Sequence, residues 1–348
     1  HHVATMAGIP LHVTRLMAGR LYPGERDVLA ATAEGALIAL KSDGSLRWKV
    51  SVGCRINDIA TADIDADGRD EVVVARQDHH VAALSADGRE LWKRELKYYR
   101  RPPYVNVVMA GDIDGDRRPE IIAGGENWRF YAFKADGTEL WNYESVHPSR
   151  SGATSDLDGD GKAEVICGTH YYWLSALNSD GTRRWAYNMG PICHDIATGV
   201  FDPSRRRGVI LGGGDGIAHI LSAEGKPLAQ FDTGDEVRKV VTADLDGDDI
   251  DEALAGSMSH SLYCFGGNGT LRWRQDLGAP VTALVAIRKD KRAIVVAGTD
   301  NGGISSLDAT GKVIASRALN SPIVDLASFG RQIIASTENG HVICLSMP

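Results

Sequence analysis

Short apolar runs alternate with polar turns along the whole chain. Residues 71–75, 120–124, 164–168 and 252–256 each begin with Glu and continue with four small or aliphatic residues. Runs of this length, bounded by polar turns, are typical of β-strands. No segment repeats apolar residues at the 3.6-residue spacing of an amphipathic helix. The pattern predicts an all-β protein.

A tight turn followed by Trp recurs with a period near 44 residues, at Trp48, Trp92, Trp141, Trp185 and Trp273. The turns are Asp-Gly or Asn-Gly pairs, which favour two-residue hairpins. Each repeat therefore reads as four antiparallel strands, and such units arranged in a ring form a β-propeller. The repeats begin near residues 12, 57, 105, 152, 195, 238, 281 and 323. We expect an eight-bladed propeller of four-stranded antiparallel blades, in a single domain spanning residues 1–348.

The two ends of the sequence complement each other. Residues 342–348 read as the third strand of the last repeat, with no Asp-Gly turn after them. Residues 2–8 align with the outer strand and trailing Gly at 47–53. We therefore expect the N-terminal strand to complete the last blade and close the ring, which removes an exposed strand edge.

Four loops carry carboxylates at positions 1, 3, 5 and 9, namely residues 63–71, 112–120, 156–164 and 244–252. Alternate acids on a tight turn direct their oxygens to one point, which suits a hard cation such as Ca²⁺. Without a cation, the clustered carboxylates would repel one another. We expect up to four structural Ca²⁺ ions, with Asp63, Asp65, Asp67, Glu71, Asp112, Asp114, Asp116, Glu120, Asp156, Asp158, Asp160, Glu164, Asp244, Asp246, Asp248 and Glu252 as ligands.

These loops differ from an EF-hand, because their last acid opens a strand instead of preceding a helix. The pattern resembles the FG-GAP and VCBS-type calcium-loop repeats of integrin-type propellers and bacterial surface proteins. The resemblance implies that Asp63, Asp65, Asp67, Glu71 and their counterparts bind calcium. Arg117 and Asp249 depart from it, because they replace the Gly at loop position 6, where a positive φ is easiest.

Propeller geometry sorts the remaining loops. The acidic loops and Asp-Gly turns share one face of the ring, and the second-to-third strand loops and blade connections share the other. That second face collects the unusual side chains of blades two to six, whereas the matching loops of blades one, seven and eight are short and plain. Since surface loops carry function on rigid scaffolds, we expect a ligand site over blades two to five.

The mixture of aromatic, His and Arg side chains suits an acidic carbohydrate, because rings stack on sugars and Arg pairs with carboxylates. The architecture resembles the eight-bladed rhamnogalacturonan lyases, which implies β-elimination on a uronate. That chemistry needs a cation for the carboxylate, a base and an acid. Candidate catalytic residues are Arg100, Arg101 and Arg129 for the first role, His147, His170 and His194 for the second, and Tyr99, Tyr104 and Tyr171 for the third. Candidate substrate-binding residues are His79, His80, Tyr98, Asn127, Trp128, Arg150, Tyr172, Arg238, Lys239 and His260.

Two other functions use the same residues. A non-catalytic propeller that binds glycan or protein would need the aromatic residues but no tuned base. A transition-metal enzyme is the other alternative, because imidazole binds Cu, Zn or Mn and six of these residues are histidines. The Asp-Gly-x-x-x-Trp turn also resembles the repeats of quinoprotein dehydrogenases and of the outer-membrane assembly propeller. We attribute this turn to blade packing and expect no quinone.

Charge and composition limit the classes of partner that the protein can bind. The formal net charge is −8 and no basic stripe is present, which disfavours nucleic acid. No apolar run approaches the ~18 residues of a membrane helix. The five cysteines have no metal-ligand spacing; Cys167, Cys264 and Cys344 read as core residues, and a Cys54–Cys193 disulfide is not favoured. We expect a secreted or periplasmic monomer, given as a mature or trimmed chain in which His1–His2 are either a tag remnant or a native start.

Overall fold

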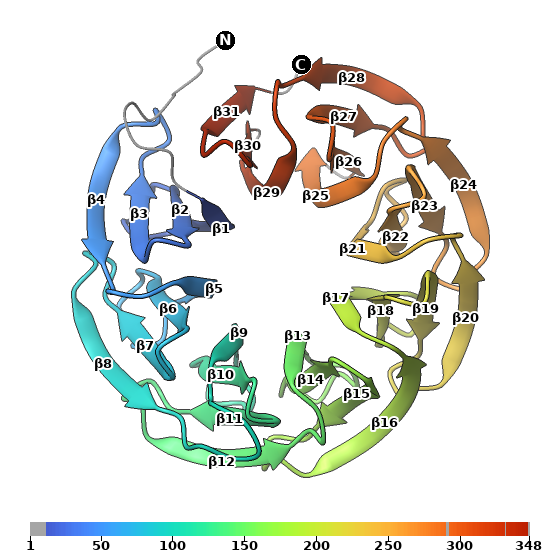
Figure 1. Cartoon of the computed structure of the whole chain (residues 1–348). Coiled ribbons are helices and arrows are strands. Elements are labelled where there is room, and N and C mark those ends of the chain that lie inside the picture. Colours follow the sequence, from blue (N-terminus) through green and yellow to red (C-terminus); the bar gives the residue numbers. More distant parts are fainter. Residues whose placement is uncertain (1–11, 290–291, 331, 347–348) are drawn as a thin grey trace.

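The computed structural model describes residues 12–289, 292–330 and 332–346, which form 31 strands in eight separate sheets (Figure 1). The first four blades contain β1 (Val13–Gly19), β2 (Asp27–Thr32), β3 (Ala36–Leu40), β4 (Leu46–Ser51), β5 (Ile56–Ala62), β6 (Glu71–Arg76), β7 (His80–Leu84), β8 (Glu90–Glu95), β9 (Val105–Gly111), β10 (Glu120–Gly125), β11 (Arg129–Phe133), β12 (Glu139–Glu144), β13 (Ser149–Ser155), β14 (Glu164–Thr169), β15 (Tyr172–Leu177) and β16 (Arg183–Gly190). The other four contain β17 (Cys193–Val200), β18 (Arg207–Gly213), β19 (Ile217–Leu221), β20 (Pro227–Asp232), β21 (Val237–Ala243), β22 (Glu252–Ser257), β23 (Ser261–Phe265), β24 (Leu271–Asp276), β25 (Val281–Lys289), β26 (Arg292–Thr299), β27 (Gly303–Leu307), β28 (Val313–Ala318), β29 (Ile323–Phe329), β30 (Gln332–Thr337) and β31 (Val342–Ser346).

The sheets are arranged as the blades of an eight-bladed propeller (Figure 1). Each blade runs from an inner strand at the central channel to an outer strand at the rim, with antiparallel neighbours throughout. The predicted all-β, eight-bladed fold is confirmed. Seven blades have four strands, and the described part of blade eight comprises β29, β30 and β31. The predicted closing strand at residues 1–8 lies outside the described residues.

In the described residues, no helix is long and apolar enough to cross a membrane. All five cysteines are free, and Cys167 and Cys264 are buried in strands as expected, whereas Cys344 is only half-buried.

The second strand of most blades is buried along its entire length, as in β2, β6, β10, β14 and β22. Neighbouring blades cover both of its faces, which explains why its sequence is a continuous apolar run and does not alternate. The outer strands alternate between exposed and half-buried residues, because one of their faces meets solvent.

The recurring Trp joins consecutive blades. Trp48 on β4 donates its indole N–H to the carbonyl of Ala86, in the turn of the next blade, over 2.8 Å. The Gly88 that ends this turn packs on the Trp48 ring: a Cβ there would lie 3.1 Å from it. Trp92, Trp141, Trp185 and Trp273 make the same bond to the following blade, over 2.6 to 3.0 Å. The Trp turn is therefore a blade-packing device.

Aspartates at the channel join other blades. Asp58, Asp195 and Asp325 occupy the same register position in blades two, five and eight. Asp58 accepts the backbone N–H of Val108 in blade three over 3.1 Å. Asp195 and Asp325 do the same for Val240 and Leu16, over 3.1 and 2.9 Å. The Asp325 contact joins the last blade to the first.

Candidate functional site

Large side chains occupy the turns between the second and third strands in four blades, in a backbone conformation that favours glycine. His79, Trp128, Tyr172 and His260 have φ values of 77°, 65°, 63° and 69°. A positive φ is rare for such bulky residues and costs roughly 1–3 kcal/mol where it is strained. The other blades place Gly35, Gly216, Gly302 and Gly340 in these turns.

Two of these turns contribute to one continuous cluster of rings over blades three and four. His147 lies at its centre, with ring centroids 5.5 Å from Trp128, 5.5 Å from Tyr171 and 6.0 Å from Tyr172. Tyr171 also meets His170 edge to face at 4.3 Å. Tyr171 and Tyr172 are 45% and 53% exposed, so the cluster presents aromatic surface to solvent.

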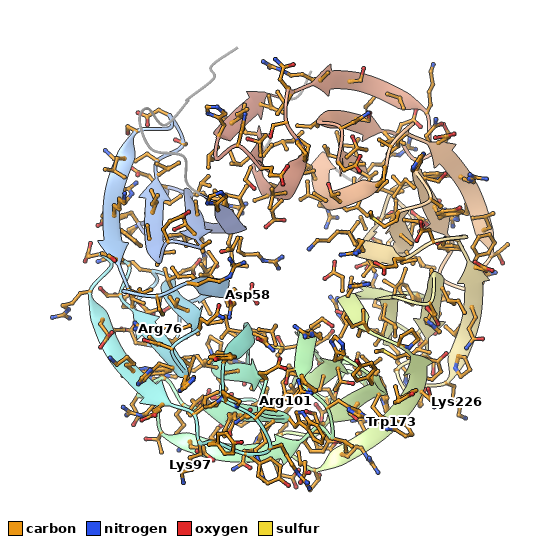
Figure 2. The ribbon with its side chains drawn as sticks, viewed as in Figure 1. Asp58, Arg76, Lys97, Arg101, Trp173 and Lys226 are labelled. Atoms are coloured by element: carbon orange, nitrogen blue, oxygen red, sulfur yellow. The ribbon has the colours of Figure 1, made fainter. Side chains whose placement is uncertain are left out.

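Arginines extend the cluster towards blade two. The Arg129 guanidinium lies 4.2 Å from the centre of the Tyr99 ring. Arg100 lies between Tyr99 and Trp128, at 5.3 and 5.7 Å from the two ring centres. Tyr99 and Arg100 belong to the loop that joins β8 to β9, which runs from Lys97 near the rim inward to Arg101 (Figure 2). We call this set the aromatic–arginine face: Tyr99, Arg100, Trp128, Arg129, His147, His170, Tyr171 and Tyr172.

Glu126 connects this face to the channel. Its carboxylate lies 3.0 Å from Nη1 of Arg101 and 3.9 Å from Nη2 of Arg150, and it accepts the Asn106 amide over 3.1 Å. Arg150 in turn donates from Nε to Nδ1 of His170 over 2.8 Å. Sequence reasoning missed Glu126, although it directly precedes Asn127 and Trp128 in a turn already singled out.

The pKa values of His147 and His170 on the face are both lowered. Burial lowers the pKa of His147 below its ordinary value. Burial also lowers the pKa of His170, and the charge of Arg150 lowers it further. Since Nδ1 of His170 accepts a hydrogen bond from Arg150, the neutral ring carries its own proton on Nε2. His147 is thus the better candidate for a base, and His170 for a hydrogen-bond donor.

Several predicted residues lie beside this face or away from it. His79 contacts Tyr104 at 5.2 Å, and Tyr98 is 71% exposed. Asn127 is fully buried and donates to the Lys97 carbonyl and the Tyr131 hydroxyl, so it supports the loop from below. The others lie elsewhere: His80 against Asp78, His194 and Arg238 against Glu236, Lys239 against Asp195, and the exposed His260 on blade six.

The acidic loops have nearly the same fold in all four blades. In the first, Asp63 accepts the backbone N–H of Gly68 and Glu71 accepts that of Ile64, over 2.9 and 3.2 Å. Arg117 and Asp249 adopt φ values of 70° and 66°, so the loop keeps its conformation without Gly at position 6. In three loops, positions 1, 3 and 9 bring carboxylate oxygens within 4.8 Å of one another. In the 244–252 loop the grouped positions are 1, 3 and 5.

Two of the four loops are contacted by an arginine from the outer strand of the same blade, which sequence reasoning missed. Arg184 contacts Asp158 and Glu164, over 2.5 and 2.8 Å. Arg272 lies 2.7 Å from both Asp246 and Glu252. Both arginines directly precede the recurring Trp, and the same position holds Leu91 in blade two and Leu140 in blade three.

The other two loops contain Arg69, Arg117 and Arg118, but among the described residues no ion pair joins an arginine to Glu71 or Glu120. Glu71 and Glu120 are almost fully buried, and burial together with the loop aspartates raises the pKa of each to about 7. Burial raises the pKa of Glu252 to about 7 as well, although Arg272 lies beside it, so the loops differ in their arginine contacts and not in this pKa. Carboxylate donors at this spacing fit Ca²⁺, which takes six to eight oxygen ligands. Among the described residues, the predicted histidines form no comparable group.

Comparison with known proteins supports the propeller. A family model for the lambda-carrageenase beta-propeller domain matches residues 27–109 and 233–321, together just under half of the chain. The part of the aromatic–arginine face at residues 128–172 lies between the two matched segments. No curated protein matches the sequence.

Solved structures of very different sequence share the fold. Sqt1 from Saccharomyces cerevisiae aligns over 99% of this chain and 98% of its own, at 12% identity with a TM-score of 0.79. The computationally designed Ika8 protein aligns over 99% and 98%, at 15% identity and 0.74. BamB from Moraxella catarrhalis aligns over 100% and 98%, at 15% identity and 0.70. The chain is therefore a β-propeller that is similar in sequence, over two segments, to the lambda-carrageenase propeller domain.

Proposed function

We propose that this propeller binds anionic polysaccharide on the aromatic–arginine face. The observation that carries the proposal is the continuous run of rings and guanidinium groups over blades three and four. Aromatic rings offer flat surfaces to sugar rings, and arginines offer bidentate contacts to carboxylate or sulfate-like groups. The similarity to a lambda-carrageenase propeller domain supports a polysaccharide as the ligand.

Strain at the turns supports the same function. Trp128 and Tyr172 hold positive φ values where other blades use Gly, so these side chains are present at a cost to stability. His79 and His260 share this conformation outside the face, so the strain supports the site only together with the ring cluster. Strained residues concentrate at ligand sites, where the gain lies in binding.

We further propose that the face cleaves a uronate by β-elimination. His147 would remove the proton from the α-carbon, which bears the carboxylate. The bond from the β-carbon to the glycosidic oxygen would break, and a double bond would form between the α- and β-carbons. The departing oxygen would take a proton from Tyr171 or Tyr172. Arg129 would neutralise the carboxylate, since Arg101 and Arg150 already face Glu126 and Arg100 lies 4.0 Å from Glu144.

The test combines binding and turnover. Wild-type protein is incubated with polygalacturonate, alginate and lambda-carrageenan, while retention on immobilised polymer and absorbance of the unsaturated product are followed. The proposal predicts retention on at least one polymer and its loss in Arg129→Met. Retention without new double bonds would favour a binding module, and cleavage without double bonds would favour hydrolysis. No retention on any anionic polymer would contradict the proposal.

We propose two structural Ca²⁺ ions, in the loops at residues 63–71 and 112–120. There, in the part of the chain that the structure describes, no arginine is ion-paired with the buried Glu71 or Glu120; Arg69 pairs with Asp87. In the loops at 156–164 and 244–252, Arg184 and Arg272 already supply a cation to the same carboxylates. The ions lie on the opposite side of the ring from the aromatic–arginine face, so their role is to stabilise the fold. Structural calcium ions, together with a polysaccharide ligand, suit a secreted or periplasmic protein.

A further inference from the structure

A cavity of about 410 Å³ lies in the central channel. It is lined by the inner strands of blades one to six, that is β1, β5, β9, β13, β17 and β21. Small-molecule sites usually measure roughly 300–1,000 Å³, so the cavity is large enough for a sugar residue. Figure 2 shows Asp58 at the inner edge of blade two, beside the open centre of the ring.

The wall combines charges of both signs with apolar surface. Arg15 places Nε 3.2 Å from the Asp58 carboxylate, and Lys239 places Nζ 4.0 Å from Asp195. Val107 and Met109 supply apolar contacts. A sugar matches such a wall, because each hydroxyl both donates and accepts hydrogen bonds, while the C–H face of the ring packs on apolar groups.

One buried hydroxyl in this wall has no partner. The Oγ1 of Thr14 is buried without a hydrogen bond, and Thr14 lines the cavity. Thr282 holds the same register position in blade seven, which does not line the cavity, and donates to the Ile323 carbonyl of blade eight over 2.6 Å. An unpaired buried hydroxyl costs about 1–3 kcal/mol, so blade one lacks here a stabilising contact that blade seven has.

The cavity is continuous with the aromatic–arginine face. Arg150 lines the cavity and also donates to His170 on the face. His194, a predicted site residue that lies apart from the ring cluster, lines the cavity as well. A chain lying on the face would therefore meet Arg150 at the mouth of the channel.

We infer that the channel cavity is the inner part of the polysaccharide site and takes the terminal sugar residue of the bound chain. Hydroxyls of this residue reach Asp58 and Asp195, and its anionic group faces Arg150. The inference rests on the proposed function and adds that the protein recognises chain ends. An open face alone would bind the middle of a chain equally well.

The experiment blocks the cavity and leaves the face intact. Ala110 lines the cavity, and Ala286 holds the same register position on blade seven, outside it. Binding of galacturonate and lambda-carrageenan oligosaccharides, one to six residues long, is measured by calorimetry for the wild type, Ala110→Phe and the matched control Ala286→Phe. Lys239→Met serves as a second cavity variant if Ala110→Phe fails to fold.

We expect about tenfold weaker binding for Ala110→Phe and Lys239→Met, and less than a twofold change for Ala286→Phe. The two ends of the oligosaccharide should differ. Modification of the end that enters the cavity, by reduction or by a bulky label, should weaken binding, and modification of the other end should not. Unchanged affinity in both cavity variants, with binding still lost in Arg129→Met, would overturn the channel inference and leave the proposed function standing. No binding of any oligosaccharide to the wild type would overturn both.

Discussion

The Nε of Arg150 donates a hydrogen bond to Nδ1 of His170 over 2.8 Å. This contact fixes which nitrogen of the neutral imidazole carries its proton, and it places a positive charge beside the ring. Glu126 faces the same guanidinium at 3.9 Å. Three residues from two blades therefore determine how His170 presents itself to a ligand.

Replacement of Arg150 by Met should raise the pKa of His170. Burial is the larger cause of its lowered pKa, and the charge of Arg150 adds to it, so part of the shift should remain in the variant. The titration of His170 is followed by NMR, with His147 as the internal control because burial alone lowers its pKa. A His170 pKa that stays the same or falls in Arg150→Met would show that the contact is absent in solution.

Strain at Trp128 predicts an unusual order of stability. At a φ of 65°, Gly is relaxed and Ala is not, so Trp128→Gly should be more stable than Trp128→Ala by about 1 kcal/mol. Both variants lose the ring and should lose glycan retention equally. Urea unfolding measures the difference. The matched control is the pair of Gly and Ala variants at Leu174, a buried strand residue of the neighbouring blade, where Ala should be the more stable. Greater stability of Ala at both positions would show that the Trp128 turn is not strained.

The calcium proposal predicts opposite effects of exchanging the residue that precedes the recurring Trp. Leu91→Arg should reduce the calcium dependence of the melting temperature, because its guanidinium would reach the loop as Arg184 does in blade four. Arg184→Leu should increase that dependence. At a hundredfold excess over Kd, each bound ion contributes roughly 2.7 kcal/mol. Thermal melts with and without EDTA test both variants, and equal EDTA effects in wild type and variants would refute the division of the loops.

We predict that residues 1–8 stabilise the junction between the last blade and the first. Among the described strands, β31 pairs with β30 alone. An apolar pocket lies beside it, between Val342 and Cys344 of blade eight and Gly44 in the turn of blade one. At five other blade junctions, a Trp of the preceding blade packs on this turn glycine. Deletion of residues 1–8 should lower the melting temperature; an unchanged melt would contradict the predicted closure.

The sequence was sufficient for the architecture because each blade repeats the same local signals. The spacing of Trp48, Trp92 and their successors gave the blade number, and the order of strands assigned each loop to a face. The cluster around His147 could also be predicted, since the repeat assigns the loops of its members to the same face of the ring.

Pairings between side chains were out of reach, because they depend on distances between strands. Nothing in the sequence says that Glu126 faces both Arg101 and Arg150, or that Lys239 points into the channel. Arg184 and Arg272 did leave a signal, since Leu91 and Leu140 stand at the same place in the repeat. That signal becomes meaningful only when the guanidinium is seen beside the acidic loop.

On the acidic side of the pH profile, the loss of any lyase activity should follow the protonation of His147. Its pKa lies below the ordinary value of about 6.5, so the ring stays neutral, and able to accept a proton, to a lower pH than a solvated histidine. Activity should therefore decline only below that pH. A decline that begins above it would assign the base to another group.

The most direct test of the central claim is retention of the protein on immobilised polygalacturonate and lambda-carrageenan, compared between wild type, Arg129→Met and the control Arg274→Met. Arg274 lies over the Tyr263 ring on blade six, so it matches the chemistry of Arg129 over Tyr99 away from the proposed site. The account predicts retention of the wild type and of Arg274→Met, and loss of retention in Arg129→Met. Equal retention of all three proteins, or of none, would contradict it.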